Sequence, residues 1–118
     1  MDSIRIKEAA VLALEDIKAR DIEVLDVRPL TTLCDYMIIA SADSTRQTKA
    51  LARNVQEELV RQGVIQQGIE GEQGGEWILV DLGSVVVHIM QPATREYYNL
   101  SELWGGFSAI PRRAAANG

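Results

Sequence analysis

The sequence is poor in the residues that build disulfides and most metal sites. Its 118 residues include one cysteine, Cys34, and one histidine, His88. A single cysteine excludes an internal disulfide and is typical of a reducing compartment. A zinc site needs three or four cysteine or histidine ligands, which these two residues cannot supply without carboxylates. We therefore expect a cytoplasmic protein with no resident metal or cofactor.

Long apolar runs and excess positive charge are also absent. No stretch is long enough to cross a membrane, and the first residues lack the apolar core of a signal peptide, so we expect no membrane partner. The net charge of -5 argues against direct DNA binding and leaves RNA at most a peripheral contact, but it permits a basic protein partner. The length predicts one domain over residues 1–107, followed by a disordered tail over 108–118.

One segment lacks basic residues altogether. Residues 62–94 contain no lysine or arginine. The same segment holds four acidic residues, which are Glu70, Glu72, Glu76 and Asp81. An acidic strand edge can be merely solvated or can face a basic partner, and the sequence leaves both readings open.

Residues 76–90 predict two strands joined by a tight turn. Both runs are rich in β-branched residues, and Gly83-Ser84 is a turn pair that fixes the register. A shift of one residue would exchange the two faces, so the pattern itself supports this register. In it one face is wholly apolar, and we expect it to be core: Ile78, Val80, Leu82, Val85, Val87 and Ile89.

The opposite face of this hairpin has mixed chemistry. The register pairs Trp77 with Met90, Leu79 with His88, and Asp81 with Val86. Because the apolar face already supplies six residues to the core, we expect that this face need not be core as well. Tryptophan is enriched at protein-binding hot spots, but a helix packed over the face would also account for Trp77. Spacing alone favours neither reading.

The rest of the chain predicts helices interleaved with strands. Helical spacing over residues 3–20, short strands over 24–28 and 36–40, and an edge strand before the hairpin give most of the elements. Ser44 and Gln47 have capping-box spacing and open a second helix that Gly63 ends. Its predicted buried stripe is Thr48, Leu51, Ala52, Val55 and Leu59. Pro92 suits the start of a short third helical segment. This order predicts an α/β (α+β) fold, with a mixed sheet of about five strands flanked by helices.

Catalytic and metal-binding patterns are weak. His88 could act as a base oriented by Asp81, but Ser84 lies in a turn and no suitable nucleophile is close in sequence. The acidic pairs at residues 21/23 and 70/72 have the spacing of one strand face, where solvated carboxylates are more usual than a Mg²⁺ site.

A helix that follows a central strand can bind anions at its N-terminus. Asp43 and Ser44 are more simply explained as helix caps. Arg46 has no capping role and remains a candidate contact.

Three segments resemble the signatures of the ribosomal silencing factor, or Iojap-like, family. The first is Asp-Tyr-Met-Ile-Ile-Ala-Ser over residues 35–41, followed by Ser44-x-Arg46-Gln47. The second is Glu70-Gly71 with Trp-Ile-Leu-x-Asp-x-Gly-x-Val-Val-Val-His over residues 77–88. The third is Arg-Glu-Tyr-Tyr-x-Leu-x-x-Leu-Trp over residues 95–104. The similarity extends from about Val11 to Trp104.

The resemblance implies a fold similar to nucleotidyltransferases but without their catalytic residues, because no Gly-Ser pair precedes Asp43. It implies a non-enzymatic repressor that binds the large ribosomal subunit through its fourteenth protein and blocks joining of the two subunits under nutrient limitation or in stationary phase. We assign partner binding to Trp77, Leu79, Asp81, His88, Met90, Tyr98 and Glu102. The free protein could also form a homodimer, since an apolar patch without its partner favours self-association. The alternative is a nucleotidyltransferase-like enzyme or nucleotide binder that uses Ser41, Asp43, Ser44 and Arg46.

Overall fold

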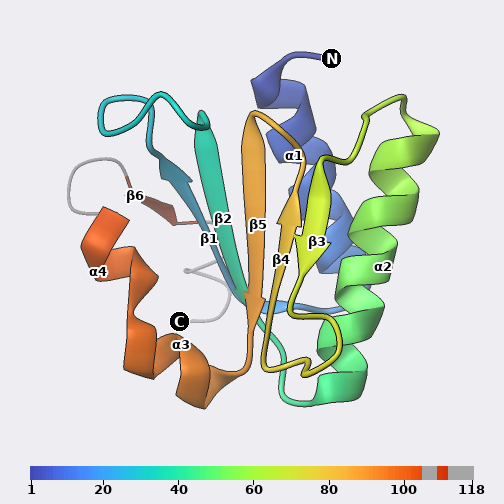
Figure 1. Cartoon of the computed structure of the whole chain (residues 1–118), viewed down its shortest axis with the longest axis vertical. Helices are drawn as coiled ribbons and strands as arrows, with labels where there is room; N and C mark the ends of the chain where they lie inside the picture. The colour runs from blue at the N-terminus through green and yellow to red at the C-terminus, as the bar shows by residue number, and fades with distance from the viewer. Residues whose placement is uncertain (105–108, 112–118) are drawn as a thin grey trace.

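One mixed β-sheet organises the chain (Figure 1). The computed structural model describes residues 1–104 and 109–111. Their elements are α1 (Ser3–Asp16), β1 (Arg20–Asp26), β2 (Tyr36–Ser41), α2 (Thr45–Arg61), β3 (Gly68–Glu70), β4 (Trp77–Asp81), β5 (Val85–Met90), α3 (Pro92–Tyr98), α4 (Leu100–Trp104) and β6 (Ala109–Pro111). The strand order is β3-β4-β5-β2-β1-β6, and β2 runs parallel to β5 while the other neighbours are antiparallel. The predicted α+β fold with a mixed sheet is confirmed.

The sheet has one strand more than the sequence predicted. Residues 109–111, which the sequence assigns to a tail, pair with β1 as β6. Residues 108 and 112–118 of that predicted tail lie outside the described residues. Within the described part of the chain, no helix is long and apolar enough to span a membrane.

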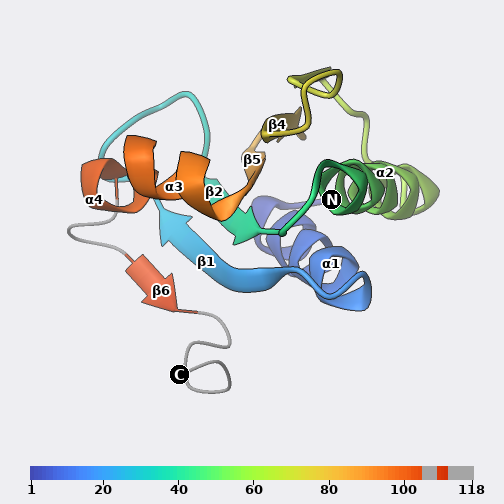
Figure 2. The ribbon, with the colours of Figure 1, turned by 90° about the horizontal axis from the view of Figure 1, so that it is seen from below.

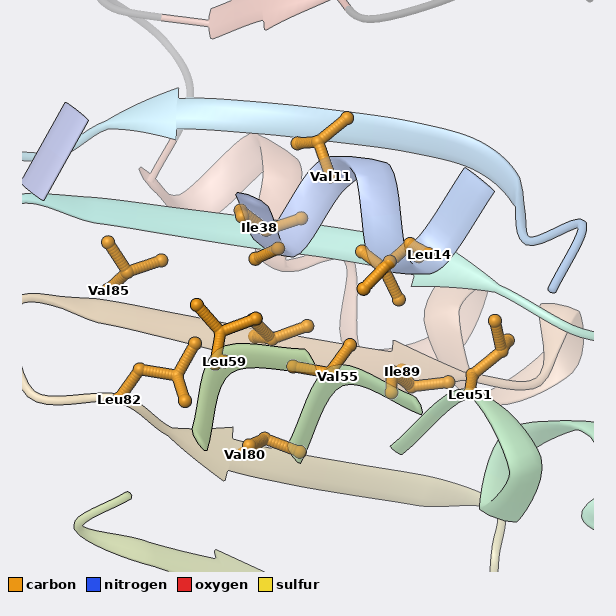
Figure 3. Packing of buried hydrophobic residues seen from close by; sticks show 14 of the residues in the cluster. Val11, Leu14, Ile38, Leu51, Val55, Leu59, Val80, Leu82, Val85 and Ile89 are labelled. Carbon is orange, nitrogen blue, oxygen red and sulfur yellow. The ribbon is translucent and has the colours of Figure 1, made fainter. Parts of the chain in front are cut away.

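Helices cover the two faces of the sheet unequally. Figure 2 shows α1 and α2 on one side of the sheet and α3 and α4 on the other. The larger core lies under α1 and α2, and β2, whose six residues are all buried, runs through the centre of the sheet. Figure 3 shows Leu51, Val55 and Leu59 of α2 above Val80 and Ile89 of the sheet. Burying each such side chain stabilises the fold by roughly 1.5–3 kcal/mol.

The hairpin has the predicted register. Trp77 pairs with Met90, Leu79 with His88 and Asp81 with Val86. All six residues of the apolar face are at most 3% exposed and belong to the larger core. Because side chains alternate along a strand, this register turns the remaining hairpin residues to the opposite side, where α3 and α4 lie.

Helix α2 follows the predicted pattern at both ends. The Oγ of Ser44 accepts a hydrogen bond from the Gln47 amide at 3.1 Å, and Gly63 has a positive φ of 92° after the last turn. The five residues of the predicted stripe are the buried residues of the helix. The Gln47 side chain does not bond to the Ser44 amide: its Oε1 accepts from the Asp43 amide at 3.3 Å. Its Nε2 donates to the carbonyls of Ile17 and Lys18, which ties α2 to the end of α1.

The first helix and first strand meet earlier than predicted. Helix α1 ends at Asp16 rather than at residue 20, and Lys18 turns the chain with a positive φ of 62°. Strand β1 then begins at Arg20 and ends at Asp26, so the predicted strand over 24–28 is shifted. The pairing with β2 is irregular between Arg20 and Glu23, where Asp21 also has a positive φ, of 50°. This polar, irregular start lacks the apolar alternation that identifies a strand.

Candidate protein-binding face

The mixed face of the hairpin is partly core, contrary to the sequence-based expectation. Met90 is fully buried and His88 is only 6% exposed. A second buried cluster on this face consists of Leu25, Val27, Met37, Ile39 and Met90, with Cys34, Trp77 and Leu100 packed against it. Met90 and His88 therefore lie beneath the surface rather than on it.

Helices α3 and α4 cover this second cluster because Arg95 anchors them to the sheet. Its Nη1 donates to the Asp21 carbonyl at 2.7 Å and to Ser41 Oγ at 2.9 Å, and its Nη2 donates to Glu23 at 3.3 Å. Both side chains of the Arg95–Glu23 pair are largely buried, so the ion pair is shielded from solvent. The hydroxyl of Ser101 also donates to Glu23. In Figure 1 the two helices lie toward the β1 side and leave β4 without a helix in front of it.

The uncovered part of this face combines aromatic, aliphatic and acidic side chains. Trp77, Leu79 and Asp81 on β4 and Val86 on β5 are each half-buried. The exposed Leu33 lies near the turn end of the hairpin and the exposed Tyr98 near the other end. We call this surface the open face; it consists of Leu33, Trp77, Leu79, Asp81, Val86 and Tyr98.

Trp77 is held in place from two sides. Its Nε1 donates a hydrogen bond to His88 Nδ1 at 2.9 Å, and its ring packs against Tyr98 with 4.8 Å between centroids. Burial lowers the pKa of His88 to about 4, so the imidazole is neutral at physiological pH. Since Nδ1 accepts from Trp77, the imidazole proton is on Nε2. His88 thus orients Trp77 from below.

A hollow of about 390 Å³ adjoins the open face at the turn end of the hairpin. It is lined by Thr31, Leu33, Cys34, Met37, Asp81, Gly83 and Val86. Asp81 also shapes the turn, because its Oδ1 accepts from the Gly83 amide at 2.8 Å. The sequence reasoning did not select Leu33 or Val86, although an apolar residue in an otherwise polar loop was a usable signal for Leu33.

The edge of the open face is acidic. Glu70 of β3 pairs with Leu79, and residues paired across antiparallel strands project to the same side of a sheet. The carboxylates of Glu70 and Asp81 therefore flank Leu79. The sequence reasoning noted these acids but could not place Glu70 on the face, because the β3–β4 register depends on the intervening loop.

The seven predicted binding residues divide into two groups. Trp77, Leu79, Asp81 and Tyr98 lie on the open face, whereas His88 and Met90 lie beneath it. Glu102 is exposed on α4, where its carboxylate accepts a hydrogen bond from Asn99. Asn99 itself has a positive φ of 48° and separates α3 from α4.

Similarity to known proteins identifies the family. The family model described as "Ribosomal silencing factor during starvation" matches residues 1–117. The chain belongs to the ribosomal silencing factor family. A ribosomal silencing factor of Chromobacterium violaceum is 53% identical over 106 residues, covering 90% of this chain and 87% of that protein. A crystal structure of a protein from the same organism has a TM-score of 0.88 at 50% identity, covering 98% and 97% of the two chains.

A more distant relative comes from the mouse. The protein named "Mitochondrial assembly of ribosomal large subunit protein 1" is 38% identical over 97 residues, which cover 80% of this chain and 42% of the mouse protein. The family resemblance drawn from the three signatures is thus confirmed. In the structure the three signatures correspond to β2 with the start of α2, to the β4–β5 hairpin, and to α3–α4.

Three of the four residues of the nucleotide-binding alternative have structural partners. Ser41 is 2% exposed and accepts from Arg95, Asp43 pairs with Arg20, and the hydroxyl of Ser44 caps α2. Arg46 alone of the four makes no side-chain hydrogen bond or ion pair within the described residues. Across residues 1–104 and 109–111, no group of three histidine, cysteine or acidic side chains is arranged to hold a metal ion.

Proposed function

We propose that this silencing factor binds the large ribosomal subunit through its fourteenth protein and sterically blocks joining of the two subunits when nutrients are limiting. The observation that carries the proposal is the open face, an uncovered apolar and aromatic surface with an acidic edge in a member of this family. The name of the mouse relative refers to the large ribosomal subunit, and the family description refers to starvation. The first supports the partner and the second supports the setting.

The composition of the open face suits a basic protein. Strands β3, β4 and β5 contribute Glu70 and Asp81 to this side of the molecule and no lysine or arginine. Ribosomal proteins are basic because they pack against RNA, so the charges of the two surfaces would be complementary. Interfaces of this kind combine an apolar centre with a polar rim. Steric occlusion needs only such binding and no catalytic group.

The proposal is tested by sedimentation through sucrose gradients. The protein should travel with purified large subunits and not with small subunits. It should also reduce the fraction of assembled ribosomes when the two subunits are mixed, because the occupied surface is no longer free for joining. Equal binding to preformed whole ribosomes and to free large subunits would show that occlusion is wrong.

The thiol of Cys34 should have no role in this binding. Burial raises the pKa of Cys34, and the nearby carboxylates of Asp35 and Asp81 raise it further. The group therefore stays a protonated, weakly nucleophilic thiol at neutral pH. We expect Cys34→Ser to bind large subunits within about twofold of the wild type, or about 0.4 kcal/mol of binding free energy, because serine is similar in size to cysteine and the protonated thiol carries no charge. A folded Cys34→Ser protein that fails to sediment with large subunits would contradict this prediction.

A further inference from the structure

Positively charged side chains without a carboxylate partner gather at one place on this acidic protein. Of the lysines and arginines in residues 1–104, five form ion pairs: Lys7, Arg20, Arg28, Arg61 and Arg95. Five others form none within the described part of the chain: Arg5, Lys18, Arg46, Lys49 and Arg53. Apart from Arg5, which is on α1, these lie on the first half of α2 or on the turn that packs against its start. We call Arg46, Lys49 and Arg53 the basic stripe.

Helical geometry places the basic stripe on one line along α2. The three residues are three and four positions apart, which puts their side chains on a single face of a helix. All three are exposed. Lys18 lies near the start of α2, because its carbonyl accepts a hydrogen bond from the Gln47 side chain at 3.3 Å, but it is not part of the stripe.

Helix stability does not account for this arrangement. The N-terminus of a helix carries partial positive charge, so cations there are unfavourable and acids are favourable. Arg46 nevertheless lies in the first turn of α2, which contains no acidic residue. Helix stability therefore gives no reason for a cation at this position, whereas an interaction with another molecule would supply one.

The start of α2 reaches the end of the sheet where the open face begins, although the helix itself packs on the opposite side of the sheet. The hydroxyl of Thr48 donates to the Gly75 carbonyl at 2.6 Å, and Gln91 Nε2 donates to Thr45 Oγ1 at 3.1 Å. These bonds fasten the start of α2 to the segment that leads directly into Trp77. Figure 1 shows the start of α2 and the connection before β4 together at the lower end of the molecule. A large partner on the open face that extends past this end of the sheet would therefore reach the Arg46 end of the stripe.

We propose that the basic stripe contacts the phosphate backbone of ribosomal RNA beside the protein that docks on the open face. The inference rests on the proposed function, which supplies a surface where protein and RNA adjoin. The net charge of -5 makes this a local contact within a larger interface rather than general RNA binding. An acidic residue, Glu72, borders the stripe on the side of β3, where it lines a hollow of about 270 Å³ together with Lys49 and Arg53.

The test compares two variants that lose the same charge. The stripe variant combines Arg46→Gln, Lys49→Gln and Arg53→Gln, and the control combines Arg5→Gln, Arg28→Gln and Arg61→Gln. Binding to purified large subunits is measured over a range of salt concentrations, and binding to the isolated fourteenth protein is measured in parallel. Affinity falls as salt rises, and each phosphate contact makes the slope of log affinity against log salt steeper by about 0.7–0.9. The slope of the stripe variant should therefore be shallower than that of the wild type by roughly 2–3.

The stripe variant should bind large subunits about tenfold more weakly than the wild type, as expected for three exposed charge contacts, and bind the isolated protein equally well. Its melting temperature should not fall, because the substitutions remove a cation from the positive end of a helix. An unchanged salt slope, an equal loss in the control, or an equal loss toward the isolated protein would each overturn the RNA contact. A wild-type protein that does not bind large subunits would instead refute the proposed function.

Discussion

Replacing Trp77 with alanine should weaken binding to large subunits by roughly thirtyfold while the domain stays folded. Truncating an aromatic residue at the centre of an interface typically costs about 2 kcal/mol or more of binding free energy. Trp77 suits this role because His88 and Tyr98 already fix its indole, so little conformational entropy is lost when a partner covers it. Sedimentation or a direct binding assay with purified large subunits measures the change.

The neighbouring residue provides the matched control. Ile78 follows Trp77 on β4 but points to the opposite side of the sheet, where it is fully buried in the larger core. Ile78→Ala should lower the free energy of unfolding by about 2–5 kcal/mol through the cavity it leaves, and should not change the affinity of the folded molecules. If Trp77→Ala destabilises the domain as strongly as Ile78→Ala, Trp77 is a core residue and the partner binds elsewhere.

The sequence predicted best where one local feature determines a whole segment. The Gly83-Ser84 turn determines the hairpin register, and because side chains alternate along a strand, it also determines which six residues enter the core. Ser44 and Gly63 likewise mark the two ends of α2. In both cases the signal lies within a few residues of the structure it controls.

The covering of the second face could not be predicted in the same way. It depends on Arg95, whose side chain reaches partners 54 to 74 positions earlier in the chain. No pattern in residues 92–104 indicates that Ser41 and Glu23 receive this guanidinium. The burial of His88 and Met90 follows from that long-range contact, which is why the sequence alone could assign both residues to partner binding without showing that they are covered.

The neutral state of His88 should make the protein sensitive to mild acid. Its pKa is lowered to about 4 by burial in the folded chain, against 6.5 for the exposed group. Between these two values the unfolded chain binds a proton that the folded chain does not, so the free energy of unfolding falls as the pH is lowered through this range. Each pH unit costs about 1.4 kcal/mol, or roughly 3 kcal/mol over the whole interval. The loss is absent at pH values well above 6.5.

Protonation of His88 would also disrupt the hydrogen bond to Trp77. Protonation turns Nδ1 of His88 into a donor that faces the Nε1–H donor of Trp77, so the bond that orients the indole is lost.

A His88→Gln variant keeps an acceptor near Trp77 and removes the titration, while the carboxylates of the two proteins titrate alike. Urea unfolding followed by circular dichroism at pH 7.5 and at pH 4.5 should show that the wild type loses about 2–3 kcal/mol more stability than the variant. An equal loss in both proteins would mean that His88 is already accessible to protons in the folded state and does not hold Trp77 as a neutral acceptor.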